Sequence, residues 1–220
     1  VQSAVAAPLV CVPPAIQVVN YTNNTITRYQ PNGTYDTTLY TGSPLSAPNA
    51  GLVLPDGTLL VSNGVANTVE KFNAYTGASL GTLVSSPAGG LSFPEQLRIG
   101  PDGYLYVASQ ANNLVQKFNA TTGALIGTVL DSADGLIAPT GLIFDSAGYM
   151  YVSNQANGGQ IRKYNPTTGS YISTLYTYPA GESPSGLTMG ADGNIYVVVQ
   201  MATSRIDKIT LAGARSTFVT

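Results

Sequence analysis

Few residues of this 220-residue chain could carry out chemistry, because the chain contains no histidine. Histidine is the usual general base of hydrolytic sites and a common zinc ligand. Its absence therefore excludes Ser-His-Asp and Cys-His catalysis and the zinc sites that are rich in histidine. A metal site built from oxygen ligands alone stays open. Any chemistry would depend on carboxylates, amides and hydroxyl groups.

Glu95 and Arg98 are the charged pair that draws attention first. Both lie in a short apolar segment that recurs along the chain. The other copies carry Ala50, Thr140 and Ser185 in place of Glu95, and Val53, Ile143 and Thr188 in place of Arg98. A charged pair in such a segment is a candidate ligand or metal site. The alternative, which the sequence favours, is a structural ion pair or a charge that fills a central channel through water.

A second candidate set consists of uncharged polar residues that recur just after the next segment: Asn20, Asn63, Ser109 and Asn154. Ringed around a channel mouth, their amide and hydroxyl groups could bind a sugar or another small polar ligand. They could equally cap the ends of strands, and we favour that interpretation.

Two further patterns indicate structure more than function. Asp131-Ser132-Ala133-Asp134-Gly135 could hold Ca²⁺, but two carboxylates fall short of the usual six to eight oxygen ligands. An inter-repeat turn is the favoured interpretation, and no other cofactor is predicted. A basic residue recurs at one position of each repeat: Arg28, Lys71, Lys117, Lys163 and Lys208. These residues could form a binding ring. We favour a structural role instead, in which each long stem covers apolar surface and its charged head stays in solvent.

N-glycosylation sequons occur at Asn20, Asn23, Asn32 and Asn119, whereas Asn165 is blocked by the following proline. Composition alone accounts for about this many sequons. Their clustering in the first repeat would mark a glycosylated edge if the source glycosylates its proteins.

These residues are positioned by five copies of one repeat. Its clearest marks are Gly33, Gly77, Gly123, Gly169 and Gly213, spaced 44–46 residues apart. In the copy from Pro139 to Tyr176, Gly141–Phe144, Tyr149–Ser153, Ile161–Tyr164 and Ser170–Tyr176 read as strands joined by short turns. A repeat of this length that forms an antiparallel meander is typical of a propeller blade.

The sequence therefore predicts an all-β, single-domain β-propeller of five four-stranded antiparallel blades. The expected blades cover residues 5–43, 44–90, 91–135, 136–180 and 181–220, with Leu9-Val10-Cys11 as the innermost strand of the first and Cys11 as a buried core thiol. Three arrangements stay open: a closed disc, which we favour, an arc of a larger propeller, and a ring that closes through another molecule or polymerises with it.

Bulk composition restricts the partners. Charged residues make up 9% of the chain and the net charge is −2, which is too little to hold DNA or RNA. No apolar run is long enough to span a membrane. The single cysteine excludes an internal disulfide framework. An uncharged polar surface suits a secreted or cell-surface setting, and residues 1–9 fit a mature N-terminus just after a signal peptide.

The motifs Pro-x-Gly-Leu, Asp-Gly-x-φ-Tyr-Val, φ-x-Lys-Tyr-Asn and Thr-Gly resemble the NHL-repeat propellers, especially their secreted bacterial and archaeal relatives. The resemblance covers nearly the whole chain and implies a fold rather than a function, since that family includes scaffolds, binding discs and a few lyases and lactonases. We expect a non-catalytic interaction or assembly module for protein or glycan, including self-association. The alternative is a metal-dependent hydrolase or lyase that uses Glu95 in the channel.

Overall fold

A computed structural model of the chain describes residues 15–155, 158–200 and 204–220, and within them the chain is almost entirely β-structure. Blade 1 comprises β1 (Ile16–Asn20), β2 (Thr25–Tyr29) and β3 (Tyr35–Thr41). Blade 2 comprises β4 (Pro48–Val53), β5 (Thr58–Asn63), β6 (Thr68–Asn73) and β7 (Ser79–Val84). Blade 3 comprises β8 (Pro94–Ile99), β9 (Leu105–Ser109), β10 (Leu114–Phe118) and β11 (Leu125–Leu130).

Blade 4 comprises β12 (Pro139–Phe144), β13 (Met150–Asn154), β14 (Gln160–Tyr164) and β15 (Tyr171–Thr177), and blade 5 comprises β16 (Ser183–Met189), β17 (Ile195–Gln200), β18 (Arg205–Ile209) and β19 (Arg215–Val219). A short 3₁₀ helix, η1 (Ser132–Asp134), lies between blades 3 and 4. Each sheet is an antiparallel meander in which strands adjacent in sequence pair. The strand expected at Leu9-Val10-Cys11, and Cys11 with it, lie outside the described residues.

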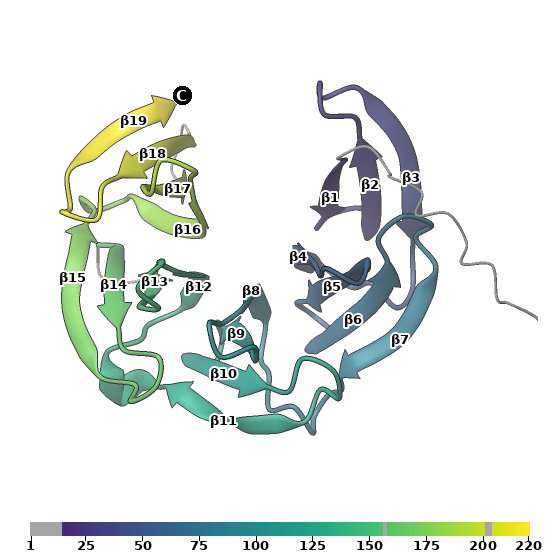
Figure 1. The fold of residues 1–220 in the computed structure, drawn as a ribbon, viewed down its shortest axis with the longest axis horizontal. Coiled ribbons are helices and arrows are strands. Elements are labelled where there is room, and N and C mark those ends of the chain that lie inside the picture. The colour runs from purple at the N-terminus through teal and green to yellow at the C-terminus, as the bar shows by residue number, and fades with distance from the viewer. Residues whose placement is uncertain (1–14, 156–157, 201–203) are drawn as a thin grey trace, which may run out of the picture.

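The blades follow one another around a common centre, which is the β-propeller arrangement that the repeat predicts (Figure 1). The innermost strands β4, β8, β12 and β16 pack successively, and β1 packs on β4. No comparable packing joins β16 to β1 in the described part of the chain, and blades 1 and 5 stand at the two ends of an arc. The favoured closed disc would need that packing, so the structure has the geometry of an arc.

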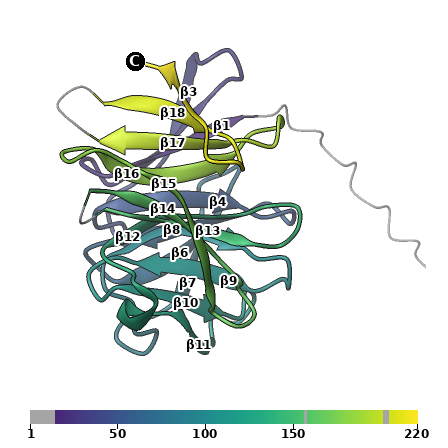
Figure 2. The same cartoon turned by 90° about the vertical axis from the view of Figure 1, so that its left-hand side faces the viewer.

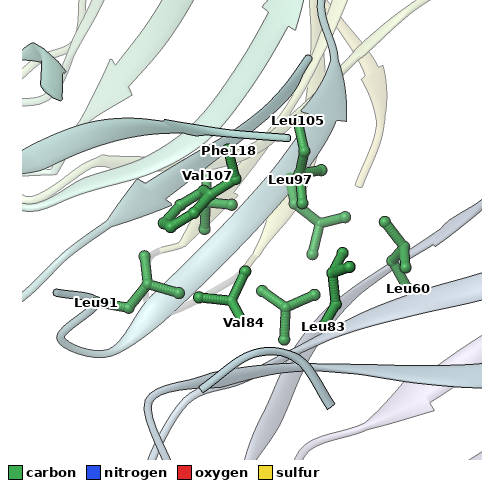
Figure 3. Close-up of a cluster of buried hydrophobic side chains, with 9 residues drawn as sticks. Leu60, Leu83, Val84, Leu91, Leu97, Leu105, Val107 and Phe118 are labelled. Carbon is green, nitrogen blue, oxygen red and sulfur yellow. The ribbon is translucent and has the colours of Figure 1, made fainter. Parts of the chain in front are cut away.

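Burial on both sides of the three inner sheets, and on one side of blades 1 and 5, explains why the blades stay together. In β13, Met150 and Val152 pack with blade 3, whereas Tyr151 packs toward blade 5, because alternate side chains point to opposite faces. We call these sides the preceding face and the following face of a blade. Figure 3 shows the matching contact between blades 2 and 3, where the labelled Leu60 and Val84 meet Leu97. Each fully buried aliphatic side chain stabilises the fold by about 1.5–3 kcal/mol.

The repeated glycine marks the contact between blades near their outer edges. Gly77, Gly123, Gly169 and Gly213 have positive φ, and a Cβ there would lie 1.7–2.7 Å from a carbonyl oxygen of the preceding blade's outer strand. Only glycine allows the backbone to approach this closely. The equivalent Gly33 of blade 1 has nothing within 4 Å of the position that a Cβ would occupy, because blade 1 has no predecessor among the described residues.

The side view shows the sheets stacked along the arc, with blade 5 and blade 1 at the same end of the molecule (Figure 2). The described residues include no helix that is long and apolar enough to cross a membrane.

Candidate functional site

Glu95 lies on β8, the innermost strand of blade 3, as the sequence predicts. Its side chain is half-buried, and burial raises the pKa of the carboxyl group to about 7. No described residue forms a hydrogen bond or ion pair with it. The carboxyl group is therefore a protonatable group near neutral pH whose charged form is disfavoured by desolvation alone.

Arg98 lies on the same strand but does not pair with Glu95 within the described residues. Its guanidinium donates hydrogen bonds to the backbone oxygens of Leu97, at 2.9 Å, and Leu187, at 3.3 Å. Leu187 belongs to β16, so Arg98 reaches from blade 3 to the inner strand of blade 5. Burial lowers the pKa of Arg98 from its usual value. The structural ion pair considered from the sequence is not the arrangement seen.

Gln96, between these two residues, was not predicted from the sequence. Its Oε1 accepts hydrogen bonds from the backbone N–H groups of Leu142 and Leu187, both at 3.0 Å, and its Nε2 donates to the Leu187 oxygen at 2.7 Å. One buried side chain thus joins blade 3 to blades 4 and 5. A signal was present in the repeats, because three other blades carry glycine at this position: Gly51, Gly141 and Gly186.

The polar residues at the ends of the second strands are tied to neighbouring loops. Asn63 is fully buried, accepts from Ser46 N at 2.5 Å and donates to the Pro44 oxygen at 2.7 Å. Ser109 accepts from Ser92 N at 2.8 Å, and Asn154 donates to the Gly135 oxygen at 2.9 Å.

Asn20 donates to the hydroxyl groups of Thr25 and Thr27, both at 3.0 Å. The four side chains thus have the contacts of strand caps, and a ligand role for them stays a prediction.

Three of the recurring lysines pair with an aspartate of the turn that follows the first strand. Lys117 lies 2.6 Å from Asp102 and Lys208 lies 2.7 Å from Asp192, while a tyrosine of the second strand donates to the same carboxylate. Lys163 makes the looser version with Asp145, at 3.7 Å, and sits over the Tyr149 ring. In these three blades the amines are therefore engaged within the blade rather than left in solvent as expected. Arg28 pairs with Asp36, and for Lys71 the expectation stays a prediction. The Lys208 contact lowers the pKa of Asp192.

The loop proposed for Ca²⁺ forms a capped turn. Asp131 accepts from Ala133 N at 2.7 Å, and Asp134 accepts from Asp131 N at 2.9 Å, so both carboxylates bind backbone. The described residues contain no group of three or more acidic, cysteine or histidine side chains that could hold a metal ion. Calcium binding stays a prediction.

Two of the four sequon asparagines, Asn23 and Asn32, are exposed on blade 1. The side chain of Asn20 is engaged as described above. Asn119 accepts from the backbone N–H groups of Thr121 and Thr122 at 2.9 and 2.8 Å, which orders its turn. Whether any of them carries a glycan stays a prediction.

The most conspicuous surfaces were not predicted. The following face of blade 5 exposes Val198 (43%) and Phe218 (58%), and they border a hollow of about 420 Å³ together with Tyr196 and Ile206. Gln96 and Arg98 lie at the inner end of that hollow. The preceding face of blade 1 exposes Ile16 and Val18 beside the half-buried Tyr29. We call these two surfaces the open faces.

Comparisons with known proteins support the fold. No protein-family model matches the chain, and no curated protein matches it by sequence. Among solved structures, it resembles nidogen in a nidogen–laminin complex (TM-score 0.75, 18% identity) and virginiamycin B lyase from Staphylococcus aureus (0.65, 16%). It also resembles the WD40 propeller of Doa1 (0.64, 13%).

The matches cover 96%, 93% and 87% of this chain but 77%, 66% and 60% of those chains. Against hydrazine synthase of Kuenenia stuttgartiensis this chain spans 63% of the matched chain. At these identities the likeness establishes the β-propeller fold alone. The chain therefore has the β-propeller fold and spans only part of each chain it resembles.

Proposed function

We propose that this chain is a non-catalytic, secreted or cell-surface propeller that binds protein or glycan and takes part in assembly. The observation that carries the proposal is the pair of open faces. Contiguous exposed apolar surface on a soluble protein marks an interaction site, because leaving it in water costs free energy. In the three inner blades the same positions are covered by a neighbouring blade.

The central residues support a structural rather than a catalytic centre. Gln96 and Arg98 use their polar groups to hold the backbone of neighbouring blades, and Asn63 and Asn154 hold loops. A catalytic group needs a side chain that is free to meet a substrate in a fixed geometry. Among the described candidates at the centre, Glu95 alone is free in this sense.

The setting and the finer family rest on the sequence. Sparse charge, one cysteine and a surface of uncharged polar groups favour an extracellular address, and the repeat motifs favour the NHL type. One structural neighbour, nidogen in a complex with laminin, offers an analogy for protein binding.

The proposal is tested by the native mass of the protein purified from its source. We expect a particle heavier than the 22.8 kDa chain, from which Val198→Asp releases the chain. Ile172→Asp is the matched control, because Ile172 is 44% exposed but lies on the outer strand β15 rather than on an open face. A 22.8 kDa monomer without any bound component would contradict the proposal.

The raised pKa of Glu95 favours one alternative, a hydrolase or lyase that uses an oxygen-ligand metal in the channel. Calorimetric titration with Ca²⁺, Mg²⁺ and Mn²⁺ tests it. Binding that is lost in Glu95→Ala but kept in Asp36→Ala, an exposed carboxylate of blade 1, would favour the enzyme. Absence of binding of all three ions would remove this alternative.

A further inference from the structure

The same interface occurs four times within the chain, each time between the following face of one blade and the preceding face of the next. Its parts recur. A small or aliphatic residue of the second strand and an aliphatic residue of the third strand meet the inner strand of the next blade. At the outer edge, a glycine turn meets a carbonyl oxygen. The two open faces are the unmatched halves of this interface.

Blade 5 carries a complete following face. Val198 and Ile206 are paired across β17 and β18, as Val19 and Ile26 are paired in blade 1, where Val19 lies against Gly51 of blade 2. The ring of Phe218 packs edge-on against Tyr196 at 4.9 Å. The face is therefore ordered and shaped like its covered counterpart, but Val198 is 43% exposed.

The described strands of blade 1 carry the second-strand and third-strand part of a preceding face. Ile16, Val18 and Tyr29 occupy the positions that in blade 4 are filled by the fully buried Met150 and Val152 and by Tyr164. The Gly33 turn has the positive φ of the other repeats, yet nothing in the described part of the chain lies in front of it.

Repeat proteins normally finish with terminal repeats whose outer surface is polar. The open faces of blades 1 and 5, as far as the structure describes them, expose apolar side chains instead. We propose that the open face of blade 5 binds the open face of blade 1 on a second copy of this chain, so that copies join head to tail. This inference rests on the proposed function and names its partner. Each copy provides both halves, and the joint continues the interface that already holds its own blades together.

The geometry of the arc determines the product. A head-to-tail contact gives a ring if its rotation closes and an open helix if it does not. The five blades already turn through most of a circle (Figure 1). A second copy that continues this turn must therefore rise along the axis to pass the first, so the expected product is a helical filament. In it, the Gly33 turn of one copy would lie at the outer edge against the strand that contains Phe218.

The test uses one disrupted face at a time. Val198→Asp leaves only the blade 1 face intact, and Val18→Asp leaves only the blade 5 face intact. Both residues are exposed, so each variant should keep the wild-type circular dichroism and unfold cooperatively as a monomer. We expect filaments of the wild type in electron micrographs and monomers of each variant by light scattering. An equimolar mixture of the two variants should give a dimer of twice the chain mass.

The mixture identifies the interface. A dimer of the mixture, with filaments retained by Ile172→Asp, supports the head-to-tail contact. Dimers of Val18→Asp alone would mean that blade 5 faces pack against each other, and would overturn the proposal. A wild type that stays monomeric at about 100 μM would overturn it as well. If that monomer instead binds a different protein through Val198, the proposed function stands and this inference fails.

Discussion

Blades 4 and 5 present nearly the same following face in opposite surroundings. In blade 4, Ser153 donates to the Ser185 oxygen of the next blade at 2.7 Å, and Ile161 is fully buried. In blade 5, the equivalent Val198 and Ile206 have no described blade in front of them, and Val198 is 43% exposed. The pattern of side chains on a blade thus specifies an interface, but the interface is buried only where a neighbouring blade covers it.

The largest expected effect compares the two isoleucines. Ile161→Ala removes side-chain volume from a filled interface and should lower the free energy of unfolding by about 2–5 kcal/mol. Ile206→Ala, measured on the monomer, should cost less than about 1 kcal/mol because water already reaches its face. Urea unfolding followed by circular dichroism measures both. Equal losses would mean that blade 5 is covered within a single chain, and the comparison would fail.

Gln96 provides the next effect, because it holds blades 4 and 5 to blade 3 from the centre. Gln96→Ala removes the side-chain acceptor of two backbone N–H groups and leaves the Leu187 oxygen with only the longer bond from Arg98, so we expect a loss of about 3 kcal/mol. Gln110→Ala, which removes one hydrogen bond to Gln155, is the matched control and should change stability by less than about 1 kcal/mol. Thermal melts of both variants measure whether the contacts of Gln96 contribute this much to stability.

Glu95, on an inner strand, should make the stability of the folded chain depend on pH. Its pKa is raised to about 7 in the folded chain, above the ordinary value of 4.5, so the folded state binds more protons between those values. Stability should therefore fall as the pH rises from about 4.5 to 7, and Glu95→Gln should remove about 1–2 kcal/mol of that fall. Urea unfolding of both proteins at several pH values measures it. A gain in stability of the wild type relative to Glu95→Gln across this window would contradict the assignment.

The smallest expected effect compares two lysines, one beside a tyrosine that the next blade covers and one beside a tyrosine on the open face of blade 5. Lys163 and Tyr151 lie in the covered blade 4, whereas Lys208 and Tyr196 lie in blade 5. Lys163→Met should cost less than about 1 kcal/mol, as exposed ion pairs usually do. Lys208→Met should have a smaller effect still, and high salt should erase the difference. Thermal melts at low and high salt measure both variants. A larger loss at Lys208 would indicate that its surroundings are covered.

Much of the fold could be predicted because the same pattern of strands and turns occurs five times in the sequence. The period of 44–46 residues and the alternating strands predicted the blades, and these are confirmed. The sequence also placed Glu95 and Arg98 on an inner strand. It could not predict the reach of Gln96, since a contact between blades 3 and 5 depends on the radius of the arc. The exposure of Val198 could not be predicted either, because the sequence pattern of its strand is the same whether a neighbouring blade covers it or not.

The two ends of the arc that the structure describes also determine the order in which the molecule opens. Each blade is stabilised by its neighbours, so blades 1 and 5 are each supported on one side only, and blade 3 on both sides and by Gln96. Unfolding should therefore begin at the ends and reach the middle last. In native-state hydrogen exchange, amide protection should rise from either end toward β9 and β10, and in a filament this gradient should flatten.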